Sequence, residues 1–335
     1  MRILMAGASG LIGRALRAQL AADGHDVRAL VRRAATTEGE YTWEGRVGSV
    51  PAAAVTWADA IASLSGAPIA KLPWTRAYRR QIMSSRVDTA GALAQAILES
   101  ERPPAVWVSA SATGFYGDAG VATAGTGAHR RGKVAASPGS ALDGCAGGTW
   151  PPASLTESSP SGGGFLAAVV RAWEAAALPA AAATRLVRAR TGLVLAPDEG
   201  ALKPLILTTK LGLGGRFGSG RQFWPWISLR DEVRAWAFAL QNESIEGPVN
   251  LVGPAPATAG EISQALARAL RRPCWLTVPA PLLRAALDGA AQDLLLASQP
   301  VRPCVLEASG FEFLDATAET AIRALINQHN HRPLA

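Results

Sequence analysis

The first 24 residues constrain the fold of this chain more than any other stretch. A short apolar run, residues 2–6, leads directly into three glycines spaced three residues apart, Gly7, Gly10 and Gly13. Apolar side chains then recur every four positions, which predicts an amphipathic helix, and a further apolar run, residues 27–31, predicts a second strand. A strand, a glycine turn, a helix and a strand are the opening unit of a parallel α/β sheet.

Each glycine of this turn has a physical role if the turn holds a dinucleotide. Gly7 permits the tight bend, Gly10 lets the backbone approach a diphosphate, and Gly13 lets the helix pack closely against the strand. The N–H groups and the dipole of the helix then face the diphosphate. Such a turn can also be purely structural, but its position between a strand and a helix favours dinucleotide binding. The predicted cofactor contacts in this turn are Gly7, Ser9, Gly10, Leu11, Ile12 and Gly13.

The end of the second predicted strand indicates which dinucleotide is bound. A site that prefers NAD usually carries an acidic residue there, which holds the ribose hydroxyl groups. This chain has Arg32 and Arg33 instead, and guanidinium groups form charge-assisted hydrogen bonds with a phosphate such as the 2′-phosphate of NADP. The alternative is that both are solvated surface arginines. We therefore predict NADPH as the cofactor and expect it to bind more tightly than NADH.

Further predicted strands bring residues toward the same end of the sheet. Residues 57–64 read as a strand, and the loop after it would line the adenosine side of the cofactor with Leu64, Ser65 and Gly66. A helix is predicted to follow, beginning at residues 74–75 and closed by two prolines at residues 103–104.

The next predicted strand, residues 106–109, is a central one. It delivers Ser109 and Ser111 to the carboxyl edge of the sheet, where ligands bind in doubly wound folds. We expect Ser109 to contact the cofactor. The alternative is that small polar residues simply end a strand here.

A set of short motifs extends through nearly the whole chain, at residues 7–13, 65–70, 85–89, 109–117, 190–195, 211–222, 226–231, 247–250, 299–303 and 310–313. Together they resemble an atypical group of extended short-chain dehydrogenases/reductases, usually labelled epimerase family proteins and similar to NAD-dependent epimerases/dehydratases. The resemblance implies an α/β fold, a Rossmann-type doubly wound parallel sheet with a smaller C-terminal substrate lobe. It places an NAD(P)-binding domain at residues 1–200 and the substrate-capping lobe at residues 201–335, with residues 226–253 completing the core sheet.

The resemblance also suggests site residues. In the related epimerases the catalytic serine or threonine, which polarises the substrate oxygen, stands at the position that matches Ser111. An arginine on the diphosphate of a nucleotide sugar stands near Arg221, so Arg221 and Gln222 are candidate substrate contacts, although a glycine-rich hairpin explains this stretch equally well. Tyr116 is the only phenol near the serine strand, and it can either substitute as a proton donor or merely pack.

The Tyr-x-x-x-Lys pair of short-chain reductases is missing. In those enzymes the lysine lowers the tyrosine pKa and holds the nicotinamide ribose, and the phenol moves a proton. The matching helix, predicted from residue 165 to about residue 178, puts Leu166 and Val170, or Phe165 and Val169, at the two sites. We therefore expect NADPH binding with weak or no ordinary epimerase activity. Any chemistry is expected to use Ser111, with Tyr116 as the second candidate.

Three functions remain compatible with the sequence. The chain is a nucleotide-sugar epimerase or reductase, a reductase of an unknown small carbonyl compound, or a catalytically silent NADPH-binding sensor or interaction protein. The first two take a small-molecule substrate. A monomer or a homodimer is expected for each.

Composition excludes several other classes of protein. The formal net charge of +7 comes from scattered arginines, without a basic helix or aromatic-interleaved stripe, which disfavours nucleic acid. No apolar stretch reaches membrane-spanning length without a charge or a proline, and the three cysteines lie too far apart to indicate a disulfide framework or a metal site. We expect a cytoplasmic protein. Residues 119–154, rich in Gly, Ala, Ser and Pro, are expected to form a mobile surface insertion.

Overall fold

A parallel sheet forms the centre of the molecule. The computed structural model describes residues 1–120, 150, 151 and 153–330, so most of the expected insertion at residues 119–154 lies outside the described residues. Seven strands run in the order β10-β6-β5-β4-β1-β2-β3, and every neighbouring pair is parallel. These strands are β1 (Arg2–Ala6), β2 (Asp26–Val31), β3 (Glu40–Thr42), β4 (Ala60–Ser63), β5 (Val106–Ala112), β6 (Arg185–Thr191) and β10 (Gly247–Leu251). The predicted doubly wound sheet is therefore confirmed, with its switch point between β1 and β4.

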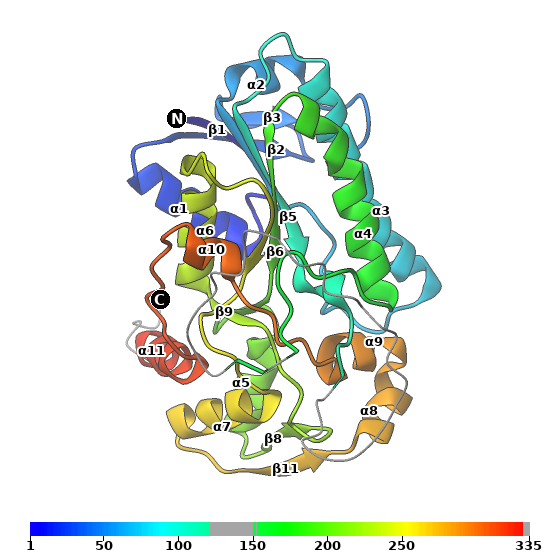
Figure 1. Ribbon diagram of the computed structural model, residues 1–335, viewed down its shortest axis with the longest axis vertical. Coiled ribbons are helices and arrows are strands. Elements are labelled where there is room, and N and C mark those ends of the chain that lie inside the picture. The colour runs from blue at the N-terminus through cyan, green and yellow to red at the C-terminus, as the bar shows by residue number, and fades with distance from the viewer. Residues whose placement is uncertain (121–149, 152, 331–335) are drawn as a thin grey trace.

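Helices cover both faces of this sheet (Figure 1). One face carries α1 (Leu11–Ala22) and α6 (Leu229–Gln241), with α10 (Cys304–Ala308) against β10. The other carries α2 (Ala52–Trp57), α3 (Arg76–Leu98) and α4 (Phe165–Ala177). The two faces bury separate apolar clusters, because successive side chains of a strand point to opposite sides: Ile3 and Met5 pack with α6, and Leu4 with α3.

The remaining elements form a smaller lobe beyond the carboxyl ends of the strands (Figure 1). Its helices are α5 (Leu202–Lys210), α7 (Ala259–Leu270), α8 (Ala280–Leu287), α9 (Gly289–Ala291), the π-helical turn η3 (Gln292–Leu296) and α11 (Ala318–Asn330). Two short parallel pairs complete it, β8 (Gly214–Phe217) with β11 (Cys274–Val278) and β7 (Leu193–Leu195) with β9 (Trp226–Ser228). The division of the chain at residue 200 stays a prediction.

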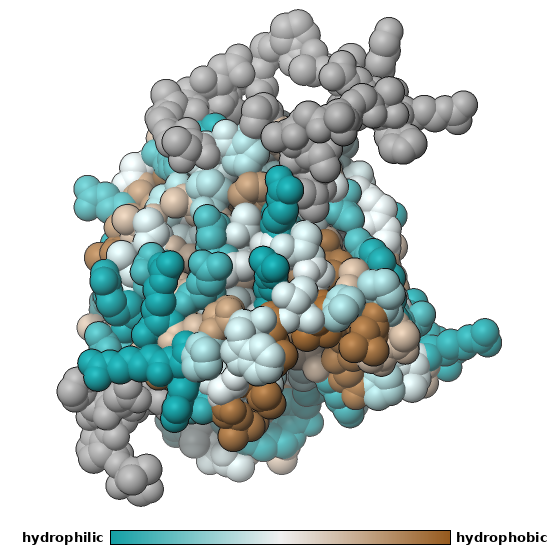
Figure 2. All heavy atoms as spheres, turned by 90° about the horizontal axis from the view of Figure 1, so that it is seen from below, coloured by the Kyte–Doolittle hydropathy of each residue, from teal (hydrophilic) through white to brown (hydrophobic). Residues whose placement is uncertain are grey.

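The surface of the molecule seen from below in Figure 2 carries hydrophobic areas between hydrophilic ones. Exposed apolar side chains of the small lobe include Leu207, Leu211 and Trp275. Within the described residues, one stretch, Phe165–Ala182, is long and apolar enough to cross a membrane when only length and composition are considered. In the fold it is α4 with the 3-10 turn η2 (Leu178–Ala182), and it packs against α3.

Two local expectations were wrong. The strand predicted over residues 57–64 begins only at Ala60, because the alanine-rich stretch before it forms α2, which ends at Trp57. Cys304 is disulfide-bonded, whereas Cys274 is free. The spacing of the cysteines in the sequence did not indicate a disulfide, so this bond was not predicted.

Candidate functional site

The glycine turn and the loop after β4 meet at the switch point of the sheet. Gly7 has a φ of +81°, and a Cβ built there would lie 2.7 Å from the carbonyl carbon of Leu64. A Cβ on Gly13 would lie 2.2 Å from the Gly7 carbonyl oxygen, whereas one on Gly10 would lie 3.6 Å from it. Gly7 and Gly13 are thus required by the fold itself. The fold does not require a glycine at position 10, where a Cβ would make only an ordinary contact.

The start of α1 is suited to an anion. Gly10 is the N-cap residue, and no side chain of the described residues accepts a hydrogen bond from the first turn of the helix. The N–H groups of that turn therefore remain available to a diphosphate, as the glycine pattern predicts. The Ser9 carbonyl accepts a 2.6 Å hydrogen bond from Arg14, which ties the turn to the outer side of α1.

The two arginines after β2 differ in their surroundings. Arg33 donates to both carboxylate oxygens of Glu40, at 2.8 and 2.5 Å, and this pairing lowers the pKa of Glu40 to about 2. Arg32 is exposed and has no ion-pair partner among the described residues. Arg32 is therefore the one of the two whose guanidinium can bind a phosphate without first leaving a carboxylate.

A cavity of about 630 Å³ extends from this crevice into the small lobe. Ile12 and Leu64 line its cofactor end, and Phe217, Trp224 and Leu295 line its far end. Most of the lining is aliphatic or aromatic. Its size and lining are those of a pocket for a small ligand whose orientation depends on a few polar groups.

Ser111 lines this cavity, but its hydroxyl is already engaged. The Ser111 Oγ–H donates to Glu174 Oε1 at 2.6 Å, and Glu174 forms ion pairs with Arg190 and Arg188. A hydroxyl has one proton to donate, so Ser111 must release Glu174 before it can polarise a substrate oxygen. Ser109 lies deeper on β5, is 2% exposed and does not line the cavity.

Tyr116 is buried away from the cavity. Its hydroxyl donates to Asn250 Oδ1 at 2.7 Å and accepts from Arg190 Nη1 at 3.0 Å. Burial raises the pKa of Tyr116 to about 12. Among the described residues, Arg190 and Glu174 link Tyr116 to Ser111, and Tyr116 does not line the cavity that Ser111 lines.

The face of α4 toward the cavity is apolar. Leu166, Val169 and Val170 line it, so the positions at which the sequence lacks the tyrosine and the lysine do face the predicted ligand. A carboxyl group of the small lobe reaches the start of this helix. Asp293 Oδ2 accepts a hydrogen bond from the Leu166 N–H at 3.1 Å, and burial raises the pKa of Asp293.

Sequence reasoning missed Arg86, a cation on the wall of the cavity. It lies on α3, with its guanidinium 5.3 Å from the ring centroid of Trp173. The available signal was its spacing: Tyr78, Ile82 and Ala90 are buried at four-residue intervals on α3, and Arg86 occupies the gap between them. A charged residue on a buried stripe calls for a partner.

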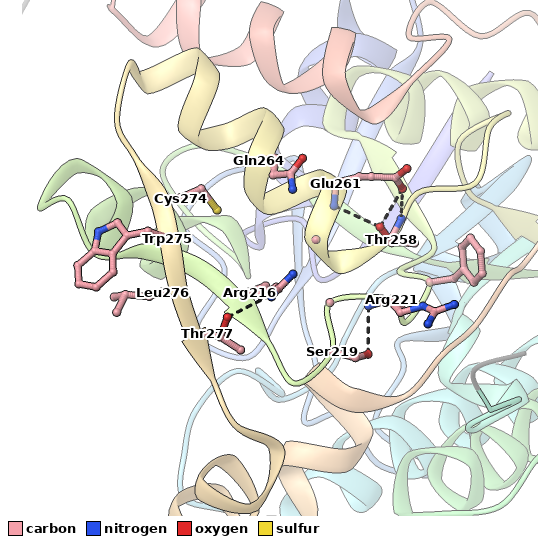
Figure 3. Close-up of a pocket in the computed structure, with 13 residues that line it drawn as sticks. Arg216, Ser219, Arg221, Thr258, Glu261, Gln264, Cys274, Trp275, Leu276 and Thr277 are labelled. Atoms are coloured by element: carbon pink, nitrogen blue, oxygen red, sulfur yellow. Dashed lines mark hydrogen bonds between the residues drawn. The ribbon is translucent and has the colours of Figure 1, made fainter. Parts of the chain in front are cut away.

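The two candidate substrate contacts lie apart. Gln222 is 2% exposed, and its side-chain amide donates to the carbonyls of Phe217 and Leu295, so it joins two segments of the small lobe. Arg221 is exposed and, with Arg216, lines a second pocket of about 480 Å³ beside the start of α7 (Figure 3). Neither residue lines the cavity that contains Ser111.

Comparison with known proteins agrees with this architecture. Residues 3–134 match the NAD dependent epimerase/dehydratase family, and residues 278–325 match a domain of unknown function, DUF1731. An epimerase family protein of Mycobacterium leprae is 36% identical over 96% of this chain and 94% of its own length. Among solved structures, the human epimerase family protein SDR39U1 with NADPH has a TM-score of 0.81 at 29% identity, covering 98% of this chain and 99% of the other.

A nucleoside-diphosphate sugar epimerase from Corynebacterium glutamicum has a TM-score of 0.72 at 28% identity, and it covers 98% of this chain but 58% of that longer protein. The matches to curated relatives extend over almost the whole length of both chains. The chain therefore belongs to the epimerase family proteins, with an NAD-dependent epimerase/dehydratase fold and a DUF1731 C-terminal region.

Proposed function

We propose that this protein binds NADPH and reduces a small, largely apolar carbonyl compound, at a low rate. The observation that carries the proposal is the cavity that joins the cofactor crevice to an apolar chamber in the small lobe. The NADPH in the structure of the human relative supports the choice of cofactor. Arg32 supports it independently, because it is exposed and has no ion-pair partner in the described part of the chain.

In this proposal each part of the site has one role, either in binding NADPH or in positioning the substrate. The glycine turn and the start of α1 hold the diphosphate, and Arg32 holds the 2′-phosphate. NADPH supplies a hydride when bound. Ser111 lies where the substrate oxygen would meet the end of β5, and its hydroxyl would turn from Glu174 toward that oxygen. Tyr116 would hold Arg190 in place without touching the substrate.

A nucleotide sugar fits this cavity less well. Its diphosphate needs several donors or cations, and Arg86 is the one cation among the described residues that line the cavity. Arg221, the expected diphosphate contact, faces the second pocket instead. The silent NADPH-binding protein remains a second candidate, and the apolar side chains at Leu166 and Val170 favour it, because no described phenol or lysine lines the cavity.

The cofactor is tested by titration with NADPH and NADH, followed by tryptophan fluorescence or calorimetry. We expect NADPH to bind more tightly. Arg32→Ala should weaken NADPH about 10- to 100-fold, since a hydrogen-bonded charge contributes about 1.5–3 kcal/mol, and should leave NADH unchanged. Arg33→Ala is the matched control and should have the smaller effect, because Arg33 is held by Glu40. Equal affinity of the wild type for both dinucleotides would contradict the proposal.

The chemistry is tested by following NADPH oxidation with a panel of apolar aldehydes and ketones and with nucleotide sugars. We expect slow turnover of an apolar carbonyl compound, lower kcat in Ser111→Ala, and a kcat close to wild type in Tyr116→Phe. Turnover unaffected by Ser111→Ala would remove Ser111 from the site. Tight NADPH binding without turnover of any compound would favour the silent binding protein.

A further inference from the structure

We propose that one end of the small lobe is a docking surface for an anionic phospholipid membrane, which it contacts from one side without crossing it. The proposal goes beyond the proposed function and does not depend on it. It rests on exposed apolar side chains and on cations without ion pairs, which the fold brings to the end of the molecule formed by α5, α7, β8 and β11 (Figure 1).

Leucine and tryptophan side chains protrude at this end, and hydrogen bonds keep them close together. Leu207 of α5 and its C-cap residue Leu211 lie one turn apart on the same face of the helix, and they are 60% and 68% exposed. Leu213 follows in the next turn of the chain and is 52% exposed. Trp275 of β11 is 67% exposed, and its Nε1–H donates to the Gly212 carbonyl at 3.1 Å. We call this set the apolar patch: Leu207, Leu211, Leu213 and Trp275.

The segments that form this end contain no acidic residue. Every charged side chain in residues 201–230 and 262–287 is a lysine or an arginine. Arg230 and Arg268 form ion pairs with carboxylates of other segments. Within the described part of the chain the others have no ion pair; these are Lys203, Lys210, Arg216, Arg221, Arg271, Arg272 and Arg284. The apolar patch is therefore flanked by positive charge that no carboxylate of its own segments neutralises.

Several of these cations lie next to the apolar patch. Lys203 and Lys210 are exposed on α5, and Lys203 stands one turn before Leu207 on the same face. Arg272 is exposed just before β11, three positions from Trp275. Figure 3 shows the ring of Trp275 on the outer side of β11, whereas Arg221 lies across the pocket of about 480 Å³ beside that strand. Long basic side chains around exposed leucines and a tryptophan are typical of proteins that lie on an anionic membrane surface.

The shape of this end favours a bilayer over a protein partner. Figure 2 looks at it directly, and hydrophobic areas there alternate with hydrophilic ones. A bilayer surface accepts such protruding side chains separately, with the indole and the leucines among the acyl chains and the cations among the phosphates. A protein partner would need a matching pocket for each apolar side chain. Pro204 and Leu205 of α5 line the apolar cavity, so docking would also bring that cavity close to the membrane.

Sedimentation with unilamellar vesicles tests the proposal on the full-length protein. We expect the wild type to bind vesicles of equal parts phosphatidylcholine and phosphatidylglycerol, and to bind vesicles of phosphatidylcholine alone at least about tenfold more weakly. Binding should weaken as the salt concentration rises, because mobile ions screen the attraction between the cations and the lipid phosphates. Inorganic phosphate at the concentration of the lipid phosphate should not release the protein, because it offers no apolar phase.

The apolar contribution is tested with a double variant, Leu207→Gln with Leu211→Gln. We expect it to bind the anionic vesicles at least about tenfold more weakly, because two leucine side chains no longer leave water. The matched control is Leu98→Gln with Leu178→Gln, which changes two exposed leucines of α3 and η2, and it should stay within about twofold of the wild type.

The charge contribution is tested in the same way with Lys210→Gln and Arg272→Gln. We expect at least about tenfold weaker binding, since each basic residue near an anionic surface contributes about fivefold. Arg17→Gln with Arg80→Gln removes the same charge from exposed positions on α1 and α3, and should have a much smaller effect. All of these side chains are exposed, so the urea midpoints of the variants should equal that of the wild type.

Trp275 reports which surface touches the lipid. Vesicles with brominated acyl chains quench an indole that enters the bilayer, and we expect them to quench part of the wild-type fluorescence. Trp275→Phe should lose that quenching while it still binds, because phenylalanine keeps an apolar ring. Equal quenching in Trp275→Phe would place another tryptophan in the bilayer and overturn the assignment of this surface.

Other results would also overturn the proposal. If the wild type does not bind the anionic vesicles, this end does not dock on a membrane, and an acidic protein surface becomes its expected partner. If the control pairs lose as much binding as the pairs at the apolar patch, the interaction depends on net charge or general hydrophobicity and not on this surface.

Discussion

Glu232 is an unusual residue at the base of the site. Its side chain is fully buried on α6, and its Oε1 accepts hydrogen bonds from Thr191 Oγ1 at 2.8 Å and from Trp236 Nε1 at 2.9 Å. Its Oε2 has no partner among the described residues. Burial raises the pKa of Glu232 to about 7 from 4.5. The carboxyl group therefore stays protonated in the folded protein at a pH where it is ionised in the unfolded chain.

This difference predicts a pH dependence of stability. Between about pH 4.5 and pH 7 the native state holds one more proton than the unfolded state, so the free energy of unfolding should fall as pH rises, by roughly 1.4 kcal/mol per unit at most. Glu232→Gln should make that fall smaller by the contribution of this one group, because an amide does not titrate. Urea unfolding at pH 5 and pH 8 measures it. The exposed Glu243→Gln is a control that should keep the wild-type slope. An unchanged slope in Glu232→Gln would contradict the assignment.

Among the elements, the turn into α1 separates the requirements of folding from those of binding. Gly10 has a φ of −74°, which any residue adopts, and a Cβ there makes only an ordinary contact with the Gly7 carbonyl. A Cβ on Gly13 would overlap the same carbonyl oxygen. Gly10→Ala therefore tests the requirement of binding, and Gly13→Ala tests the requirement of folding.

We expect Gly10→Ala to unfold at the urea concentration of the wild type but to bind NADPH at least about tenfold more weakly, since its methyl group would occupy the approach of the diphosphate. Gly13→Ala should be destabilised by about 1–3 kcal/mol, the usual cost of overpacking, before any effect on binding is considered. Urea midpoints and NADPH titrations measure the two effects. Wild-type affinity in Gly10→Ala would place the diphosphate elsewhere.

At the scale of the whole molecule, the small lobe is attached to the helices of the sheet at the mouth of the cavity. Ala290 of the lobe belongs to an apolar cluster with Trp74 and Ile82 of the α3 region, and Asp288 pairs with Arg79 of α3. Asp293 reaches the first turn of α4, whose own N-cap residue, Gly164, has no side chain. The small lobe thus supplies a cap for α4, a helix that covers the central sheet.

This contact allows a stability role of Asp293 to be distinguished from a chemical one. Asp293→Ala should lower the free energy of unfolding by about 1 kcal/mol, the typical effect of losing a helix cap, whereas Asp293→Asn should retain most of it because an amide oxygen can also accept from the Leu166 N–H. Turnover of any substrate found should survive in Asp293→Asn. If Asp293→Asn is as stable as the wild type but inactive, Asp293 would instead be identified as a proton carrier.

Much of the fold was predictable from local patterns. The strand, glycine turn, helix and strand at the N-terminus were predicted correctly, because their signals repeat within a few residues and each reflects local geometry. The helices that became α3 and α4 were found for the same reason. The start of β4 was missed, because an alanine-rich stretch before a buried strand carries no strong boundary signal.

The surroundings of each candidate site residue could not be predicted in this way, because they depend on contacts between distant parts of the chain. Ser111 meets Glu174, 63 residues away, and Tyr116 meets Asn250, 134 residues away. Both pairs form only when the parallel strands β5, β6 and β10 and the helix α4 are assembled in one order. Local sequence thus sufficed for a dinucleotide-binding fold without a Tyr-x-x-x-Lys pair. Which hydroxyl and which cation face the cavity followed from strand order and packing, because burial and charge compensation are properties of the assembled chain.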